Sequence, residues 1–344
     1  MRVSDFDFAL PEERIALRPI APRHAARQLV VKEGVLYDRS VWDMVDELRA
    51  GDLIVFNDTK VIPSYLFATR GAMTTEVNLH KRLSPTEWLA FAKKTKRLQG
   101  GDTLEFGDGK LTATIAEIHD GGEILLSFDV QVGRLEGLLA EIGLMPLPPY
   151  IASKRPVDTK DQSDYQTMFA TRVGAVAAPT ASLHFTPELM ARLEAQDIKT
   201  AYLTLHVGAG TFLPMKVEDT RDHKMHAEYG EVSAEVAATI NATHQAGGRV
   251  LAVGTTVLRL LESATDEHGR THPFQGDTSI FITPSYQFRC ADMLMTNFHL
   301  PKSTLFMLVC AFAGTDTMKR AYAHAIAHKY RFYSYGDSGL LFRS

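Results

Sequence analysis

The first sixty residues alternate between hydrophobic and polar positions in a way that predicts a hairpin, a helix and a buried strand. Two alternating runs within 28–38 flank the turn pair Glu33-Gly34 and are typical of a β-hairpin. A helical period then covers 41–50, with Ser40 before it as an N-cap and a glycine after it. Residues 52–57 are apolar almost without interruption, which indicates a strand buried on both faces.

Between residues 61 and 129 the pattern changes to short strand-like runs without a helical period. Glycine-rich turn signals separate these runs, and six short strands in succession favour a small antiparallel barrel. The expected strands cover 61–68, 75–83, 87–93, 103–106, 110–118 and 123–128. A helix with an apolar face follows at 135–142, and the proline-rich segment 145–151 then leads the chain away.

Beyond residue 145, helix and strand patterns alternate as in an α/β fold. The expected helices cover 187–196, 233–245, 255–264, 303–314 and 316–329, and the expected strands cover 199–207, 249–254 and 278–283. Because strand patterns precede the β-rich segment and resume after it, we expect that segment to be an insertion. The prediction is an α/β body, mixed-sheet or barrel-like, formed by 1–60 and 145–344. A small antiparallel β-barrel domain with its following helix is inserted into it at 61–144.

Composition places the chain among ordinary globular proteins. Of its 344 residues, 45% are hydrophobic and 23% are charged, which is enough for a sizeable core. The two cysteines, Cys290 and Cys310, exclude a disulfide framework and indicate a reducing compartment. The longest apolar run, 304–314, has about half the length of a membrane span. We therefore expect a cytoplasmic protein without a membrane partner, and a monomer is the starting expectation.

The net charge of −4 argues against an electrostatic nucleic-acid binder as a whole, but the basic residues are unevenly distributed. Six basic residues and one acidic residue fall within 81–97, and 319–331 contains basic residues without an acidic one. Such runs belong either to solvated faces or to surfaces that contact RNA phosphates. The candidate RNA contacts are Lys93, Lys94, Lys96, Arg97, Lys329 and Arg331.

Four segments combine polar functional groups with glycine or other small residues. They cover 174–185, 205–212 with its continuation at 222–228, 253–256 and 295–304. In the second segment a strand ends in His-Val-Gly-Ala-Gly-Thr, and ligands of α/β proteins usually bind at such strand ends. In the third segment two threonines open a helix whose first amide groups are suited to an anion.

Histidine and carboxylate side chains in these segments are the candidates for proton transfer. They are His206, His223, His226, His299, Asp222 and Glu228. The candidates for substrate binding offer hydroxyl, amide, cationic or backbone groups. They are Thr180, His184, Gly208, Gly210, Thr211, Thr255, Thr256, Arg259, Asn297 and Lys302. The sequence does not distinguish which histidine is a base and which is an acid.

Each segment also has a plainer interpretation. A dinucleotide-binding loop is weakly supported, because Leu213 stands where the third glycine of that motif would be. His223 and His226 have the spacing of metal ligands on a helix, so a metal-dependent hydrolase that adds His206 and His299 is an alternative. The threonines are equally suited to capping helices. The other histidines are expected at the surface: His24, His80, His119 and those near the C-terminus.

Seven stretches, in the same order, resemble one family along nearly the whole chain. They are 1–6 (MRVSDF), 56–63 (FNDTKVIP), 145–151 (MPLPPYI), 178–181 (APTA), 206–212 (HVGAGTF), 296–301 (TNFHLP) and 330–337 (YRFYSYGD). Together they are highly specific. The chain resembles the S-adenosylmethionine:tRNA ribosyltransferase-isomerases of queuosine biosynthesis, although Ser182 and Val257 differ from the residues usual in that family.

The resemblance implies a tRNA substrate and S-adenosylmethionine as a co-substrate that donates its ribosyl part, with no true cofactor and no metal. The acceptor would be 7-aminomethyl-7-deazaguanine at the wobble position. The products would be epoxyqueuosine-tRNA, adenine and methionine. The family also implies an α/β body with an inserted β-barrel, in agreement with the pattern of hydrophobic positions.

Two further classes of protein remain as alternatives. A non-catalytic RNA-binding module is disfavoured by the net acidity and by the lack of an aromatic RNP-like pattern. A methyltransferase would use the same donor, but its donor product keeps the adenine. Release of free adenine therefore distinguishes the two reactions.

Overall fold

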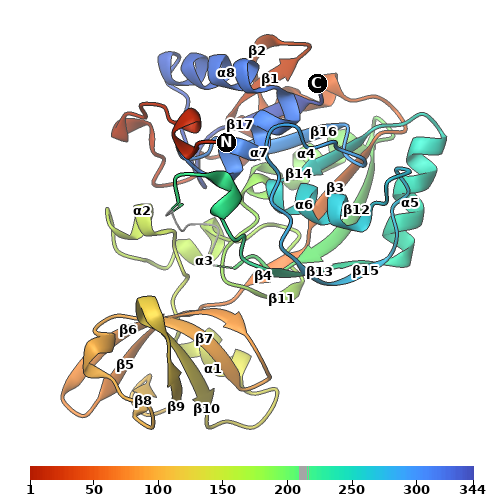
Figure 1. Ribbon diagram of the computed structural model, residues 1–344. Coiled ribbons are helices and arrows are strands. Elements are labelled where there is room, and N and C mark those ends of the chain that lie inside the picture. Colours follow the sequence, from red (N-terminus) through yellow and green to blue (C-terminus); the bar gives the residue numbers. More distant parts are fainter. Residues whose placement is uncertain (209–214, 216) are drawn as a thin grey trace.

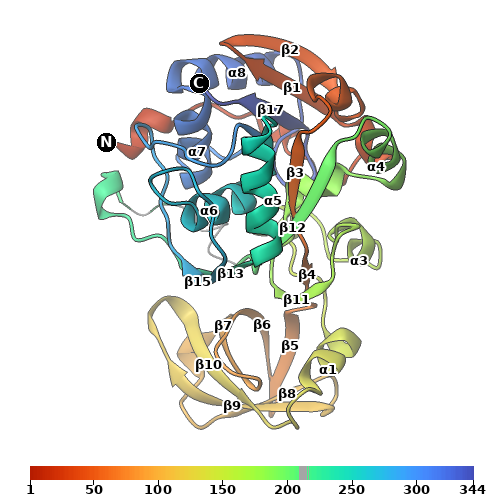
Figure 2. The ribbon, with the colours of Figure 1, turned by 90° about the vertical axis from the view of Figure 1, so that its right-hand side faces the viewer.

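The computed structural model describes residues 1–208, 215 and 217–344, which form a large α/β body and a smaller β-barrel (Figure 1). Two perpendicular views show the barrel at one end of the body, with β4 (Thr59–Val61) and β11 (Arg172–Ala175) on the side of the body that faces it (Figures 1 and 2). The expected fold class is therefore confirmed, with a mixed open sheet in the body. Within the described residues, no helix combines the length and the apolar composition needed to cross a membrane.

A nine-stranded mixed sheet, ordered β15-β13-β12-β3-β14-β16-β17-β1-β2, forms the centre of the body. Its strands are β1 (Arg27–Lys32), β2 (Val35–Ser40), β3 (Leu53–Asn57), β12 (Lys199–Leu205), β13 (Glu228–Val232), β14 (Val250–Val253), β15 (Phe274–Thr278), β16 (Met293–Asn297) and β17 (Ser338–Phe342). The four neighbours β12, β3, β14 and β16 run parallel to one another. Antiparallel partners flank them, with β13 against β12 and β17 against β16.

Both faces of this sheet are covered, because its central strands are apolar on both sides. Leu53 and Val55 of β3 belong to one core, whereas Ile54 and Phe56 belong to the other. The first core is covered by α5 (Ala234–Gln245), α6 (Thr255–Ala264), α7 (Thr304–Ala313) and α8 (Thr315–Ala327). The second is covered by α4 (Pro187–Glu194) and the 3-10 helix Val41–Glu47, and Figure 2 shows α4 across the sheet from α5. Two short helices, α2 (Pro149–Ala152) and α3 (Asp161–Asp164), lie in the connection that follows the barrel.

The inserted barrel closes in the order β10-β7-β6-β5-β8-β9. Its strands are β5 (Tyr65–Arg70), β6 (Met73–Arg82), β7 (Glu87–Ala92), β8 (Thr103–Phe106), β9 (Leu111–Ile118) and β10 (Glu123–Phe128), so all six strands expected here are confirmed. Alternate residues point inward and form a core separate from those of the body, with Trp88 and Phe106 among its buried members. The helix α1 (Leu135–Ile142) adds Leu135 and Leu139 to the same core.

The chain enters and leaves the barrel through two segments that touch. Tyr65 and Leu144 exchange both backbone hydrogen bonds, at 3.2 and 2.9 Å. Gly143, directly after α1, lies so close to the other segment that a Cβ there would be 2.0 Å from the carbonyl oxygen of Pro63. This contact fixes the root of the barrel, which is the place where the chain enters and leaves it. It thereby also fixes which side of the barrel faces the body.

The α-helix expected at 41–50 is wrong, since the structure has the 3-10 helix Val41–Glu47. Its N-terminus is as expected, because Ser40 and Asp43 form a capping box. At the other end the buried carboxylate of Asp52 accepts the backbone amide of Arg49 and also pairs with Arg249. This tertiary ion pair turns the chain toward β3 before a longer helix can form.

The strand expected at 278–283 is also misplaced. The observed strand β15 covers Phe274–Thr278, and the chain leaves the sheet immediately afterwards. The Thr278 hydroxyl lies 2.6 Å from that of Ser263 on α6, and the carbonyl of Ile280 accepts a hydrogen bond from Arg259 Nε at 3.3 Å. Contacts with α6 therefore replace sheet pairing for the apolar residues that follow Thr278.

Two glycines of the α1 region are expected to respond in opposite ways to substitution by alanine. Gly143→Ala forces a methyl group against an immobile backbone carbonyl and should lower the free energy of unfolding by about 1–3 kcal/mol. Gly137→Ala is the matched control, because Gly137 lies within the same helix with nothing within 4 Å, and it should raise stability by up to about 1 kcal/mol. Urea denaturation measures both changes. Equal effects would contradict the close contact at the barrel root.

Candidate active site

Residues from four separate parts of the chain meet at one edge of the sheet, because the parallel strands β12, β3, β14 and β16 all end there. His206 follows β12, Thr59 follows the end of β3, Gly254 follows β14, and His299 follows β16. These segments are separated by up to about 240 residues in sequence, yet the pairing of the strands brings them together. The carboxyl edge of a parallel sheet is the usual place for a ligand in α/β proteins.

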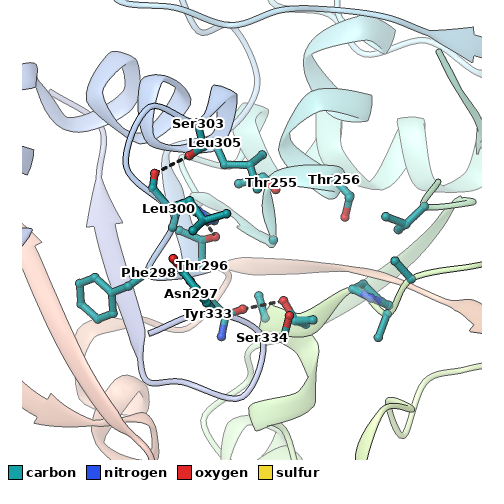
Figure 3. A pocket seen from close by; sticks show the side chains of 18 of the residues that line it. Thr255, Thr256, Thr296, Asn297, Phe298, Leu300, Ser303, Leu305, Tyr333 and Ser334 are labelled. Atoms are coloured by element: carbon teal, nitrogen blue, oxygen red, sulfur yellow. Dashed lines mark hydrogen bonds between the residues drawn. The ribbon is translucent and has the colours of Figure 1, made fainter. Parts of the chain in front are cut away.

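A small cavity of about 90 Å³ opens at this edge (Figure 3). Its walls come from the segments 177–181, 254–256 and 296–300, together with residues of the 330–337 stretch. Thr255 and Thr256 lie on one side of it, and Asn297 and Ser334 lie on another (Figure 3). Five of the predicted residues thus line this cavity: Thr180, Thr255, Thr256, Asn297 and His299.

A chain of hydrogen bonds fixes the floor of this cavity. The Thr180 hydroxyl donates to Asn297 Oδ1 at 2.8 Å, and Asn297 Nδ2 lies 3.4 Å from His184 Nε2. His184 is buried, and desolvation, followed by the charge of Arg331, lowers its pKa to about 4. His184 is therefore neutral near pH 7 and serves as an acceptor that orients the Asn297 amide.

His299 is held in a similar way. Its Nε2 lies 3.0 Å from the Thr296 hydroxyl, and its backbone amide donates to the Tyr322 hydroxyl at 2.9 Å. Burial lowers the pKa of His299 to about 3. The imidazole is consequently neutral, and it lines the cavity as a hydrogen-bonding group.

The helix α6 starts at the cavity without a side-chain cap. Its N-cap residue is Gly254, so the amides of the first turn have neither an intrahelical acceptor nor a capping side chain. The hydroxyl of Thr256 is also buried and has no hydrogen-bond partner among the described residues. An anion placed in the cavity would meet the positive end of a helix and a buried donor.

A larger cavity of about 780 Å³ lies between the body and the barrel, and Val207 lines both cavities. The body contributes five predicted residues to it: His206, Gly208, His223, His226 and Glu228. The barrel contributes Glu123 and the segment 80–85. The two cavities together therefore bring nearly all of the predicted histidines to one region.

His206 has a defined orientation in the larger cavity. Its Nδ1 lies 2.8 Å from the Thr59 hydroxyl, which is 3.4 Å from the carbonyl oxygen of Arg172. When Thr59 donates to that carbonyl, the imidazole donates from Nδ1 and presents an unprotonated Nε2. Burial is the main cause that lowers the pKa of His206, so the ring is suited to accept a proton.

Gly174 makes room for this ring. A Cβ at Gly174 would lie 2.7–2.9 Å from three atoms of the His206 imidazole. The backbone of β11 therefore forms the surface on which the ring lies. Neither Gly174 nor Thr59 was predicted to act on His206, because tertiary strand pairing creates both contacts: β11 pairs with β4, and β12 pairs with β3.

Glu228 and Arg259 form a buried ion pair, with Nη1 and Oε2 2.5 Å apart. The other oxygen of Glu228 accepts the backbone amide of Gly208 at 3.0 Å. The pair thus fixes the start of the segment after His206 to α6. The Gly208 amide is therefore directed at Glu228, which also lines the larger cavity.

The remaining predicted residues lie apart from the cavity linings or outside the described residues. Asp222 is exposed, and Lys302 forms an exposed ion pair with Asp7 at 2.8 Å. Gly210 and Thr211 lie outside the described residues. No group of three or more His, Cys, Asp or Glu that could hold a metal occurs in the described part of the chain.

The predicted RNA contacts line neither of the two cavities. Lys93 pairs with Glu76, and Arg331 pairs with the buried Asp337. Among the residues described, the basic side chains that line the larger cavity are Lys81 and Arg82, from the same basic run.

His80 was predicted to lie at the surface, and that prediction is wrong. Its side chain is 14% exposed and lines the larger cavity, with Nε2 2.8 Å from Glu123 Oε1. Its neighbour His119 is 37% exposed, as expected. The alternation of β6 buries Thr75, Val77 and Leu79 and places His80 on the outer face of the barrel, so no local sequence signal marks His80 as a cavity residue.

Comparison with known proteins gives one consistent result. A family described as "Queuosine biosynthesis protein" matches residues 3–341. Proteins named S-adenosylmethionine:tRNA ribosyltransferase-isomerase are similar along the whole chain: the one from Caulobacter vibrioides is 57% identical over 362 residues, covering 100% of this chain and 99% of the relative. The one from Mesorhizobium japonicum is 58% identical over 356 residues, with the same coverage.

A solved structure is similar as well. The crystal structure of S-adenosylmethionine tRNA ribosyltransferase from Thermotoga maritima has 31% sequence identity and a TM-score of 0.56. The match covers 98% of this chain and 100% of that one.

Acid is expected to destabilise the protein through its buried histidines. The folded-state pKa values of about 3 for His299 and about 4 for His184 lie below the ordinary 6.5. Below pH 6.5 the unfolded chain binds protons at these sites and the folded protein does not. Stability is therefore complete above pH 6.5 and falls toward pH 4 by about 1.4 kcal/mol per pH unit for each histidine.

Urea denaturation between pH 7 and pH 4.5 measures this dependence. His299→Gln should reduce the dependence of the free energy of unfolding on pH by about 1.4 kcal/mol per pH unit, the contribution of one histidine. His268→Gln is the control, since that side chain is 82% exposed, and it should leave the slope unchanged. A His299→Gln variant with the wild-type slope would contradict the neutral, buried state of His299.

Proposed function

The chain belongs to the queuosine biosynthesis family and is a transferase-isomerase that acts on tRNA, and we propose that S-adenosylmethionine is its ribosyl donor. The acceptor is 7-aminomethyl-7-deazaguanine at the wobble position of the tRNA. The products are epoxyqueuosine-tRNA, adenine and methionine. The observation that supports this proposal best is that the two cavities are neighbours, with Val207 in the lining of both, because the reaction needs a donor and a nucleobase side by side.

The chemistry starts from the positive sulfur of the donor. The sulfonium withdraws electrons from the adjacent 5′ carbon, so a base can remove a proton there and leave an ylide. Adenine leaves as the sugar ring opens, and it takes up a proton. The aminomethyl nitrogen of the nucleobase then attacks the sugar fragment, and a sugar oxygen displaces methionine to close the epoxide. The protein must supply a base, a proton for adenine and a site that excludes water.

His206 is the proposed base. Its ring is largely buried and neutral, its Nδ1 is occupied by Thr59, and its Nε2 is the atom that remains for a substrate. His223 and His226 line the same cavity and are the proposed proton carriers for the later steps. His299, with its pKa of about 3, is proposed to bind a substrate as a neutral donor or acceptor.

The smaller cavity is proposed to hold the methionine part of the donor. Its lining has no lysine or arginine among the described residues, which argues against a phosphate of RNA. The uncapped start of α6 and the unpartnered Thr256 hydroxyl suit a carboxylate instead. Thr180 and Asn297, linked by a hydrogen bond, are proposed to contact the sugar.

The larger cavity is proposed to take the nucleobase, extruded from a single-stranded loop of the tRNA. Lys81 and Arg82 border this cavity and are suited to neighbouring phosphates. The more distant candidates in 93–97 and 329–331 remain predictions for the outer part of the RNA. Two alternatives belong to other classes of enzyme. A methyltransferase would release no free adenine, and a metal-dependent hydrolase would lose its activity on chelation.

The reaction is tested by incubating the protein with S-adenosylmethionine and an RNA that carries the aminomethyl base. Adenine release with a matching mass gain on the RNA is expected, and His206→Ala should lower turnover at least about 100-fold. His268→Ala is the control at a remote, exposed histidine and should keep the wild-type rate. If the RNA gains only a methyl group and adenine stays on the donor, the proposal is wrong. A near-normal rate for His206→Ala would remove His206 as the base.

The carboxylate site is tested by comparing the binding of S-adenosylmethionine with that of its decarboxylated form. Thr256→Val should weaken binding of the complete donor about tenfold, the cost of one hydrogen bond to a charged group, and leave the decarboxylated form unaffected. Thr167→Val is the matched control, because Thr167 is also buried with an unpartnered hydroxyl but does not line either cavity. Calorimetry measures the affinities, and equal losses for both ligands would contradict a carboxylate at α6.

A further inference from the structure

His80 occupies an irregular position in the barrel. In the pairing of β6 with β7, Leu79 lies opposite Ala90 and Lys81 lies opposite Leu89, so His80 is the extra residue of a β-bulge. A bulge re-aims a side chain that regular pleating would direct elsewhere. Here the re-aimed side chain lines the cavity between the barrel and the body.

The imidazole of His80 is held on two sides. It stacks on Phe91, with the ring centres 4.3 Å apart and the planes inclined by 17°. Its Nε2 lies 2.8 Å from Glu123 Oε1 on the neighbouring part of the barrel. Burial is the main cause that lowers the pKa of His80, so the ring is neutral. Its buried Nε2 faces the Glu123 carboxylate and carries the proton, so Nδ1 is left as an acceptor for a ligand.

This part of the barrel adjoins the catalytic edge of the body. The carbonyl oxygen of His80 is 4.0 Å from where a Cβ of Gly208 would stand, two residues after His206. Lys81 pairs with Asp277 of the body at 3.8 Å. His226, on the opposite wall, is near enough to influence the pKa of His80.

We propose that the inserted barrel binds the target nucleobase of the RNA through His80, which Glu123 and Phe91 hold in place. This inference rests on the proposed function and adds the barrel to the active site. A neutral imidazole held with Nδ1 unprotonated suits an N–H or amino group on the edge of a base. Lys81 and Arg82, the next residues along β6, would then meet the phosphates beside that base.

The chain provides a matched pair of histidines for the test. His80 and His119 both contact Glu123, at 2.8 Å each, but His119 is exposed and does not line the cavity. With an anticodon stem-loop that carries the aminomethyl base, His80→Gln should raise KM for the RNA about tenfold and leave KM for S-adenosylmethionine unchanged. His119→Gln should stay within about twofold of wild type in both.

A second variant tests the support of the ring. Glu123→Gln keeps the imidazole but weakens its anchor, so RNA binding measured by fluorescence anisotropy without donor should weaken by a smaller factor than in His80→Gln. The proposal is overturned if folded His80→Gln and His119→Gln bind the RNA alike, or if His80→Gln raises the donor KM instead. A wild-type protein that forms no product would refute the proposed function itself, which separates the two failures.

Discussion

The parallel pairing of β12, β3, β14 and β16 is the constraint on which the rest of the structure depends. Parallel strands end at the same edge, so the polar segments that follow them meet although they are far apart in the chain. The segments before and after the barrel both contribute strands to this pairing. The same pairing places the uncapped start of α6 at the smaller cavity and the ring of His206 at the neighbouring larger one.

Burial then decides the chemical state of the groups at this edge. His184 and His299 are neutral because they are desolvated, and His206 is shifted in the same direction. A site with neutral histidines and a buried hydroxyl is suited to binding charged substrates without competing cations of its own. The barrel completes the enclosure, because the contact at Gly143 fixes its root and the bulge at His80 directs a side chain at the body.

Sequence reasoning predicted the elements that carry strong local patterns and missed those that tertiary contacts create. The six barrel strands alternate clearly, and α4, α5 and α7 begin with polar caps, so these were found. β16 is buried along its whole length and gives no alternation, so no strand was predicted there. The residues around His299 and Thr180 were found from composition and motif. His80 was missed because a bulge, which depends on the partner strand, determines where it points.

The central claim is that one enclosed region, formed by the carboxyl edge of the sheet and the barrel, holds both substrates at once. The most direct measurement is a crystal structure with an unreactive donor analogue and an anticodon stem-loop carrying the aminomethyl base. The account predicts the extruded base between the barrel and the body, with the donor's 5′ carbon near His206 Nε2. A base that stays stacked in its loop, or a donor bound away from the segments around Thr180, His206, Thr255 and His299, would contradict it.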